Sequence, residues 1–155
     1  IDYKPLIIVI ILIIILICLI FYYLRPAIRI TKRSFKYKKE KDGLVEIKTM
    51  LHIKNTSNRT VKDVKVIDIL PKMVKPTPEF GTLKPAKAQK STAGIRFIWE
   101  IPLLERNSER VISYVVRSVL PVIGTITLPS ASVQYIDKKG KIINIVSNKS
   151  ITSSE

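Results

Sequence analysis

The chain has 155 residues, a length that allows one ordinary domain and an appendage. Lys and Arg outnumber Asp and Glu by 27 to 12, which gives a formal net charge of +15. The single Cys excludes an internal disulfide, and one His with one Cys excludes a zinc site of the clustered kind, so the fold depends on its apolar core.

The chain begins with an apolar stretch, residues 6–24, that contains no charge, Gly or Pro. At about 1.5 Å per residue, a helix of this length spans about 28 Å, close to the ~30 Å hydrocarbon core of a bilayer. A buried core helix would need a polar face, and a cleaved signal peptide would need a small-residue cleavage site; neither is present. We therefore predict a transmembrane helix over residues 1–24, with the bilayer as a partner. Leu6, Ile15 and Leu24 mark the span, and Phe21, Tyr22 and Tyr23 mark its interfacial end.

A basic segment, here called the collar (residues 25–42), follows the span. Cations this close to a membrane bind anionic head groups with about 1 kcal/mol each. Ile28, Ile30, Phe35 and Tyr37 partly alternate, so the collar also fits a first strand that starts at the membrane surface. We predict that its Lys and Arg residues contact lipid or another acidic partner: Arg25, Arg29, Lys32, Arg33, Lys36, Lys38, Lys39 and Lys41.

After the collar the hydrophobic period becomes two, which is typical of half-buried β-strands. The polar cluster 55–60 predicts a hairpin between its two flanking strands, and the Pro-rich segment 72–92 predicts irregular chain with one short edge strand near 80–83. The pattern predicts an all-β, immunoglobulin-like sandwich of about seven strands over residues 43–149, followed by a tail, 150–155. We predict Trp99 at the core centre, with Phe97, Ile101 and Tyr114 around it. The strands are expected at 43–55, 61–70, 95–101, 110–120, 124–137 (broken near Pro129) and 142–148.

Several motifs in this region carry a resemblance: "VEIKTMLHIKNTSNRTVKDVKVIDILP", "FGTLKPA", "WEIPLL", "ERVISYVVR" and "LPSASVQY". In this order they resemble the conserved-repeat domain of unknown function that occurs on archaeal and bacterial cell-surface proteins. The resemblance covers roughly residues 43–149, although "ERNSER" replaces the family's Gly-Glu turn. It implies an immunoglobulin-like spacer, stalk or adhesion module without catalysis. The junction "LRPAIRI" is similar to that of membrane-anchored proteins in which such a domain follows a hydrophobic segment.

No residue pattern in the chain indicates catalysis. His52 lies mid-strand between Leu51 and Ile53, a poor setting for a base, and Asp63 and Asp68 fall on opposite faces of their strand. The five glycines form no phosphate-binding loop. We therefore predict no catalytic residues, metal, cofactor or small-molecule substrate.

Three sequons begin at Asn55, Asn58 and Asn148. They predict either glycosylation sites or simply residues that suit turns, and both readings stay open. They favour an extracellular sandwich, as the resemblance does, whereas the cation-rich flank favours the cytoplasm by the positive-inside rule. Because the sequence begins at Ile1 and not at Met, we expect further residues upstream that bear on this balance. The side of the sandwich stays open, and the resemblance favours the extracellular one.

The first hypothesis is a non-enzymatic, membrane-anchored module at the cell surface with a structural, spacer or adhesion role. Its partner would be a protein, or a second copy that pairs through a sheet edge. The alternative is a cytoplasm-facing adaptor whose collar binds anionic lipid, an acidic protein or, least favoured, RNA. A pilin-like filament subunit is a third reading.

Overall fold

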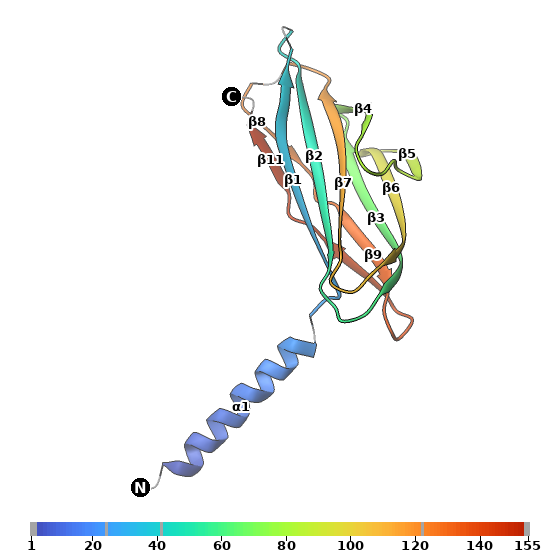
Figure 1. Ribbon diagram of the computed structural model, residues 1–155. Helices are drawn as coiled ribbons and strands as arrows, with labels where there is room; N and C mark the ends of the chain where they lie inside the picture. Colours follow the sequence, from blue (N-terminus) through green and yellow to red (C-terminus); the bar gives the residue numbers. More distant parts are fainter. Residues whose placement is uncertain (1–2, 24, 41, 122, 154–155) are drawn as a thin grey trace.

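The computed structural model describes residues 3–23, 25–40, 42–121 and 123–153 (Figure 1). One helix precedes a β-domain, and the strands of the β-domain follow one another without a further helix in the described residues. The elements are α1 (Lys4–Tyr23), β1 (Ile28–Lys39), β2 (Val45–Asn55), β3 (Val61–Pro71), β4 (Val74–Phe80), β5 (Lys87–Ser91), β6 (Gly94–Leu104), β7 (Glu109–Ser118), β8 (Thr125–Leu128), β9 (Ser132–Ile136), β10 (Ile142–Val146) and β11 (Ser150–Ser153).

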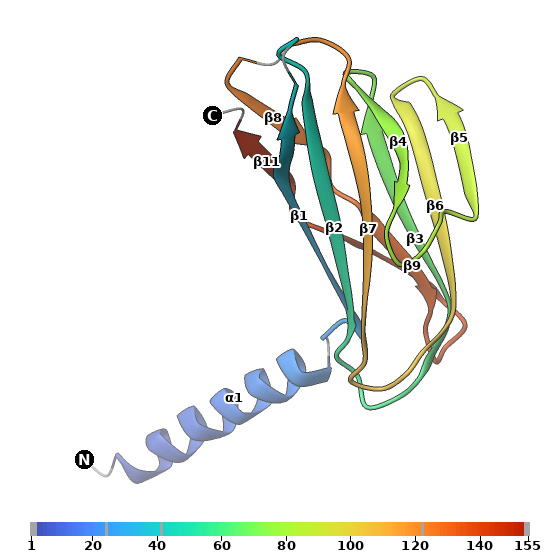
Figure 2. The same cartoon turned by 45° about the horizontal axis from the view of Figure 1, so that its top comes forward.

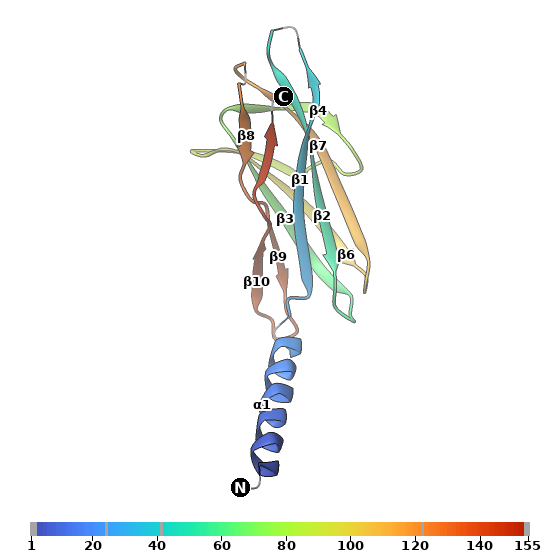
Figure 3. The ribbon, with the colours of Figure 1, turned by 90° about the vertical axis from the view of Figure 1, so that its left-hand side faces the viewer.

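Two sheets face each other and enclose the core. One sheet has the strand order β1-β2-β7-β4, and the other has the order β10-β9-β3-β6-β5. A short pair of strands, β11-β8, lies beside β1 (Figure 3). Buried apolar residues alternate with more solvent-exposed residues along the strands, as sheet-on-sheet packing requires. The predicted all-β, immunoglobulin-like sandwich with one N-terminal apolar helix is confirmed. The described residues contain eleven strands, more than the seven expected from the sequence.

The predicted hairpin between 43–55 and 61–70 is wrong. β2 pairs with β1 and β7, whereas β3 pairs with β6 and β9, so the two strands belong to opposite sheets. The loop 56–60 therefore crosses from one sheet to the other. Two half-buried strands joined by a polar loop satisfy either arrangement locally, and only the packing of the two apolar faces selects the crossing.

The Pro-rich segment 72–92 also differs from the expectation, because it contains two strands rather than irregular chain. β4 and β5 each lie at the outer edge of a sheet, on the same side of the sandwich (Figure 2). An edge strand leaves one row of backbone N–H groups unpaired, so Pro76 and Pro78 in β4 remove few ladder hydrogen bonds. Proline at this density therefore indicated the edge of a sheet.

The sandwich is larger at both ends than the predicted range 43–149. β1, which lies in the collar, pairs with β2 over its whole length and contributes the buried Ile28 and Ile30. Ser150–Ser153, placed in the predicted tail, pairs with β8. The last strand carries alternating Ile and Thr between Ser residues, a pattern too short and too polar to identify from the sequence.

Aromatic side chains from both sheets meet at the core centre. Trp99 is fully buried, and its ring lies 5.5 Å from that of Phe97 and 5.7 Å from that of Tyr114, centroid to centroid. Phe97 also meets Phe80 edge-to-face at 5.8 Å. The Trp99 indole N–H donates to the Leu83 carbonyl at 3.2 Å, so its polar atom is satisfied. Ile101 is buried nearby on the same face of β6.

Candidate functional site

α1 is the element that fits a membrane. Among the described residues it is the one helix long and apolar enough to cross a bilayer, with a mean hydropathy of 3.5 in its most apolar window. None of its residues is buried in the protein, Leu6 and Ile15 included. Phe21, Tyr22 and Tyr23 are exposed at its C-terminal end, while Leu24 lies outside the described residues. Length and composition therefore suit a membrane span, and a signal sequence near the N-terminus would have the same properties.

The collar does not form a compact basic cluster beside α1. It runs along β1, whose 12 residues extend about 36 Å at ~3.3 Å per residue. β1 starts at the helix end of the sandwich and turns into β2 at the opposite end (Figure 1). Arg25 and Arg29 are exposed near the helix, whereas Lys38 and Lys39 are exposed at the far end. Arg33 is exposed midway, Lys36 is half-buried, and Lys41 lies outside the described residues.

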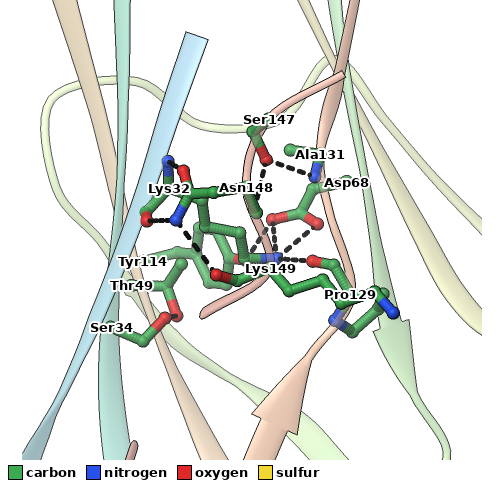
Figure 4. A network of polar contacts seen from close by, with 10 residues as sticks. All are labelled: Lys32, Ser34, Thr49, Asp68, Tyr114, Pro129, Ala131, Ser147, Asn148 and Lys149. Atoms are coloured by element: carbon green, nitrogen blue, oxygen red, sulfur yellow. Dashed lines mark hydrogen bonds and ion pairs between the residues drawn. The ribbon is translucent and has the colours of Figure 1, made fainter. Parts of the chain in front are cut away.

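Lys32 corrects the lipid-contact prediction, because its side chain is buried at the centre of the sandwich. Its Nζ atom donates to Asp68 at 2.7 Å (Oδ1) and 2.8 Å (Oδ2), and to the carbonyl oxygen of Pro129 at 2.8 Å (Figure 4). Both charged side chains are 0% exposed. The Tyr114 hydroxyl donates to Oδ2 of the same carboxylate. Lys32, Asp68 and Tyr114 are here called the core triad.

Strand alternation places the core triad inside. Lys32 follows Ile28 and Ile30 on the inner face of β1, and Asp68 lies between Val66 and Leu70 on the inner face of β3. Lys32 was expected to be one cation of the collar, and Asp68 was considered only as lying on the face opposite Asp63. Both residues could have been predicted to be buried from their positions in the sequence. Each lies an even number of residues from buried aliphatic residues of its strand, and so points to the same face as they do. A charge at such a position indicates a buried partner.

Burial dominates the electrostatics of the core triad. Desolvation raises the pKa of the Asp68 carboxyl, although the charge and hydrogen bonds of Lys32 and the Tyr114 hydroxyl oppose this. Desolvation lowers the pKa of the Lys32 ammonium, against the attraction of Asp68. Burial, then the neighbouring Asp68, raise the pKa of Tyr114 well above its usual value, so its hydroxyl stays protonated and donates. All three shifts favour uncharged forms of the triad.

Asn148 holds the main chain of Lys32 in place. Its Oδ1 accepts from the Lys32 backbone N–H at 2.9 Å, and its Nδ2 donates to the Lys32 carbonyl at 2.8 Å (Figure 4). Nδ2 also donates to the Lys149 carbonyl at 3.0 Å. The side chain therefore replaces a neighbouring strand at this point of the β1 edge, and both of its N–H groups are engaged.

The three sequons differ in their environments. Asn55 is fully buried, and its Nδ2 donates to the carbonyl groups of Arg59, Leu104 and Glu105 at 2.7, 3.0 and 2.9 Å. This corrects the prediction for Asn55, because a glycan has no room there and the amide organises the loop between β2 and β3. Asn148 uses its amide as described, whereas Asn58 is exposed at the loop tip. Asn58 is thus the sequon whose placement suits a glycan.

The described residues contain no cluster of three or more His, Cys, Asp or Glu that could hold a metal ion. His52 pairs with Glu109 at 3.0 Å on the outer face, across the β2–β7 ladder. Asp63 has a positive φ of 52° and is not among the paired residues of the β3–β6 ladder, and it lies five residues before Asp68 on β3. Neither arrangement provides a base next to a nucleophile.

The free edges of the two sheets are not equivalent. β4 carries Pro76 and Pro78, and β5 carries Lys87 and Lys90 among five residues, which are two common protections against edge pairing. β10, with the sequence Ile-Ile-Asn-Ile-Val, has neither Pro nor charge and pairs with β9 on one side.

Comparison with solved structures supports the fold. A major pilin subunit of Bacillus cereus matches with a TM-score of 0.51 and 8% identity over 81% of this chain and 40% of that one. A non-cellulosomal cohesin from Archaeoglobus fulgidus matches at 0.48 and 12%, covering 81% and 90%. An exo-β-N-acetylglucosaminidase from Vibrio harveyi matches at 0.46 and 11% over 79% of this chain, which spans 18% of the length of that enzyme.

The strand arrangement and the likeness to the pilin subunit place the chain in the class of immunoglobulin-like β-sandwiches. No protein-family model matches the sequence, and no curated protein is similar to it. Membership in the conserved-repeat family therefore stays a prediction.

Proposed function

We propose that the chain is a non-enzymatic, membrane-anchored β-sandwich that serves as a structural or adhesion module at the cell surface. In this proposal α1 is the anchor and the sandwich is the interacting part. The same fold in a major pilin subunit is an example of such a sandwich in a pilus protein. The conserved-repeat resemblance favours the extracellular side, and the exposed sequon at Asn58 is consistent with it.

The observation that carries the proposal is the edge strand β10, which contains neither Pro nor a charged residue. Ile142 and Val146 point outward and are 68% and 60% exposed, and Ile136, opposite Ile142 on β9, is 50% exposed. An open edge with apolar side chains beside it pairs with an incoming strand, which supplies both ladder hydrogen bonds and apolar burial. The partner we propose is a β-strand of another protein or of a second copy of the chain.

A single charge at this edge tests the proposal. In Ile142→Lys, association of the full chain in detergent micelles, measured by cross-linking and sedimentation, should weaken about tenfold or more, because the edge loses apolar area and gains an unpaired cation. The matched control is Ala88→Lys on the exposed edge strand β5, which should leave association unchanged. If no self-association occurs, cross-linking on intact cells should capture a partner with the unaltered chain and with Ala88→Lys. Equal capture by Ile142→Lys would contradict strand pairing at β10.

The side of the membrane has its own test. Protease added to intact cells should cleave the sandwich if it is extracellular, with lysed cells as the control. Protection until lysis would favour the alternative, a cytoplasm-facing adaptor for acidic partners. Phe35 and Tyr37 are exposed on β1, and the Lys48 ammonium lies 5.8 Å from the Tyr37 ring centroid, which is the observation that favours such an adaptor. Its binding would weaken steeply with salt.

We also propose that the end of the sandwich nearest α1, rather than the whole collar, contacts lipid head groups. This holds whichever side of the membrane the sandwich occupies. Arg25 and Arg29 lie there. The hairpin between β9 and β10 turns at the same end (Figure 3), and its exposed cations are Lys138, Lys139 and Lys141.

A further inference from the structure

A primary amine and a carboxyl group are held in contact inside the sandwich. The Lys32 Nζ atom lies 2.7 and 2.8 Å from the two carboxyl oxygens of Asp68, and both side chains are 0% exposed. Groups held in this way react as if their concentration were about 10⁵–10⁸ M. The closed core also excludes the water that would reverse a condensation. This geometry is that of two reactants held together.

The surroundings favour the reactive protonation states. Desolvation raises the pKa of the Asp68 carboxyl and lowers that of the Lys32 ammonium, so the core favours a neutral acid beside a neutral amine. A neutral amine has the lone pair that attack requires, and a neutral acid is a far better electrophile than a carboxylate. A proton that moves from Nζ to Oδ1 produces both forms at once, with no change in net charge.

Two further groups orient the pair. The Tyr114 hydroxyl donates to Oδ2 of Asp68, where negative charge develops when an amine adds to the carboxyl carbon. The Pro129 carbonyl accepts from Nζ at 2.8 Å and thereby fixes the direction of the amine. Asn148 clamps the Lys32 main chain on both its N–H and its carbonyl side. The amine, the carboxyl and the donor to the oxyanion thus come from β1, β3 and β7 (Figure 4).

We propose that Lys32 and Asp68 condense into an intramolecular amide that joins β1 to β3. Nζ of the neutral amine forms a bond to Cγ of the protonated carboxyl, and the negative charge on Oδ2 is stabilised by Tyr114. The Cγ–Oδ1 bond then breaks. Oδ1 leaves as water with its carboxyl proton and one proton of the amine, and Oδ2 remains as the amide carbonyl. The step consumes no oxidant, reductant or other reactant.

The position of this bond gives it a mechanical role. β1 follows α1 directly in the chain, so a pull between anchor and sandwich acts first on β1. β1 and β3 belong to opposite sheets, and without the amide β1 is held through its ladder with β2 and its core contacts. A Lys32–Asp68 amide transfers the load to the central strand of the other sheet.

The test is the intact mass of the full chain, purified in detergent and measured under denaturing conditions. The expected mass is that of the sequence minus one water. After trypsin digestion, tandem mass spectrometry should find the peptide of Lys32 joined to that of Asp68, with no cleavage after Lys32. Lys32→Arg keeps the positive charge but has no reactive amine, and should show the full sequence mass. It also retains Asp42–Gly43, a pair that loses water by cyclisation, and so controls for that route.

Tyr114→Phe keeps the ring in the core and should slow the loss of water at least several-fold in freshly made protein. A full sequence mass in unaltered chain, fresh and after prolonged incubation, would overturn the proposal whether or not the variants fold. Water loss that persists in Lys32→Arg would do the same. Loss of ammonia instead, with Lys32 joined to Asn148, would refute the assignment to Asp68. The β10 proposal is independent of every one of these outcomes.

Discussion

The Nζ atom of Lys32 and the carboxylate of Asp68 are 2.7 Å apart at the centre of a sandwich, on strands of opposite sheets. A buried pair of this kind stabilises little relative to apolar side chains, because desolvation offsets the attraction. Loss of one partner should destabilise the fold strongly, because the remaining charge is buried without water to solvate it. We therefore expect the pair to specify which strands face each other more than it adds stability.

The pair gives the first prediction. Measured against protein whose intact mass shows that the amide has not formed, Lys32→Met should lower the free energy of unfolding by about 3–5 kcal/mol, because Asp68 stays buried without a cation. Lys32→Met with Asp68→Asn should recover more than half of that loss, since no charge remains and Tyr114 keeps an acceptor. The control, Arg33→Met, changes the next and exposed residue of β1 and should stay within about 0.5 kcal/mol.

Trp99 supplies the measurement for this and the following predictions. It is the one Trp of the chain and is fully buried, so its fluorescence reports unfolding of the sandwich in denaturant. A double variant no more stable than Lys32→Met would contradict an electrostatic origin of the loss.

Asn55 gives the second prediction. Asn55→Ala removes the donor to three carbonyl groups and the acceptor for Ser57, and should lower the free energy of unfolding by about 2–4 kcal/mol. Asn58→Ala, three residues later at the exposed loop tip, should change it by less than about 0.5 kcal/mol. Equal effects of the two substitutions would show that Asn55 does not hold the crossing loop together.

Gly94 gives the third prediction. At its φ of +142°, a Cβ atom would lie 1.8 Å from the carbonyl oxygen of Leu70 in the neighbouring strand, which leaves no room for any side chain. Gly94→Ala should therefore destabilise the sandwich by about 3 kcal/mol or more. At Gly140, φ is +73° and a Cβ would meet nothing within 4 Å, so Gly140→Ala should cost about 1 kcal/mol, from backbone strain alone. Denaturant titration of both variants distinguishes steric overlap from strain.

The ion pair of Arg59 with Asp137 gives a prediction about pH. The Lys138 backbone N–H, then the Arg59 side chain, lower the pKa of the Asp137 carboxyl below its ordinary value of 3.8. A depressed folded-state pKa stabilises the fold above the unfolded-state value, and this contribution is lost as the pH falls through the folded-state value. Asp137→Asn should thus be less stable than the unaltered chain near neutral pH.

The difference in the free energy of unfolding between Asp137→Asn and the unaltered chain should shrink as the pH falls below about 4. Unfolding curves at several pH values check this. A stability difference that is independent of pH would mean that Asp137 acts through its hydrogen bonds in either protonation state. The Arg59–Asp137 pair joins the β2–β3 loop to the β9–β10 hairpin. In Asp137→Asn, backbone hydrogen exchange should therefore become faster in both segments.

The sequence was informative wherever one local rule acts alone. The apolar stretch determined a helix, and alternation predicted strands at 43–55 and 95–101, which the structure has at Val45–Asn55 and Gly94–Leu104. It was misleading where two arrangements share one local pattern. The strands on either side of 56–60 alternate equally well as a hairpin or as a crossing between sheets, and the buried amide of Asn55 is part of what selects the crossing.

The core triad shows the same limit at the level of single residues. Parity along β1 and β3 was sufficient to place Lys32 and Asp68 inward, since each shares a face with buried aliphatic neighbours. Their contact depends on how β1 of one sheet lies over β3 of the other, and that relation joins residues 36 positions apart.

By itself, then, the sequence determined an apolar helix, a set of alternating strands and the class of a β-sandwich, because backbone geometry and hydrophobic period act over a few neighbouring residues. Only the tertiary structure decided that the basic collar pairs with β2, that Lys32 contacts Asp68 and that β10 lies at the edge of its sheet. Those properties depend on which surfaces pack together, and packing is a relation between distant segments that no local period encodes.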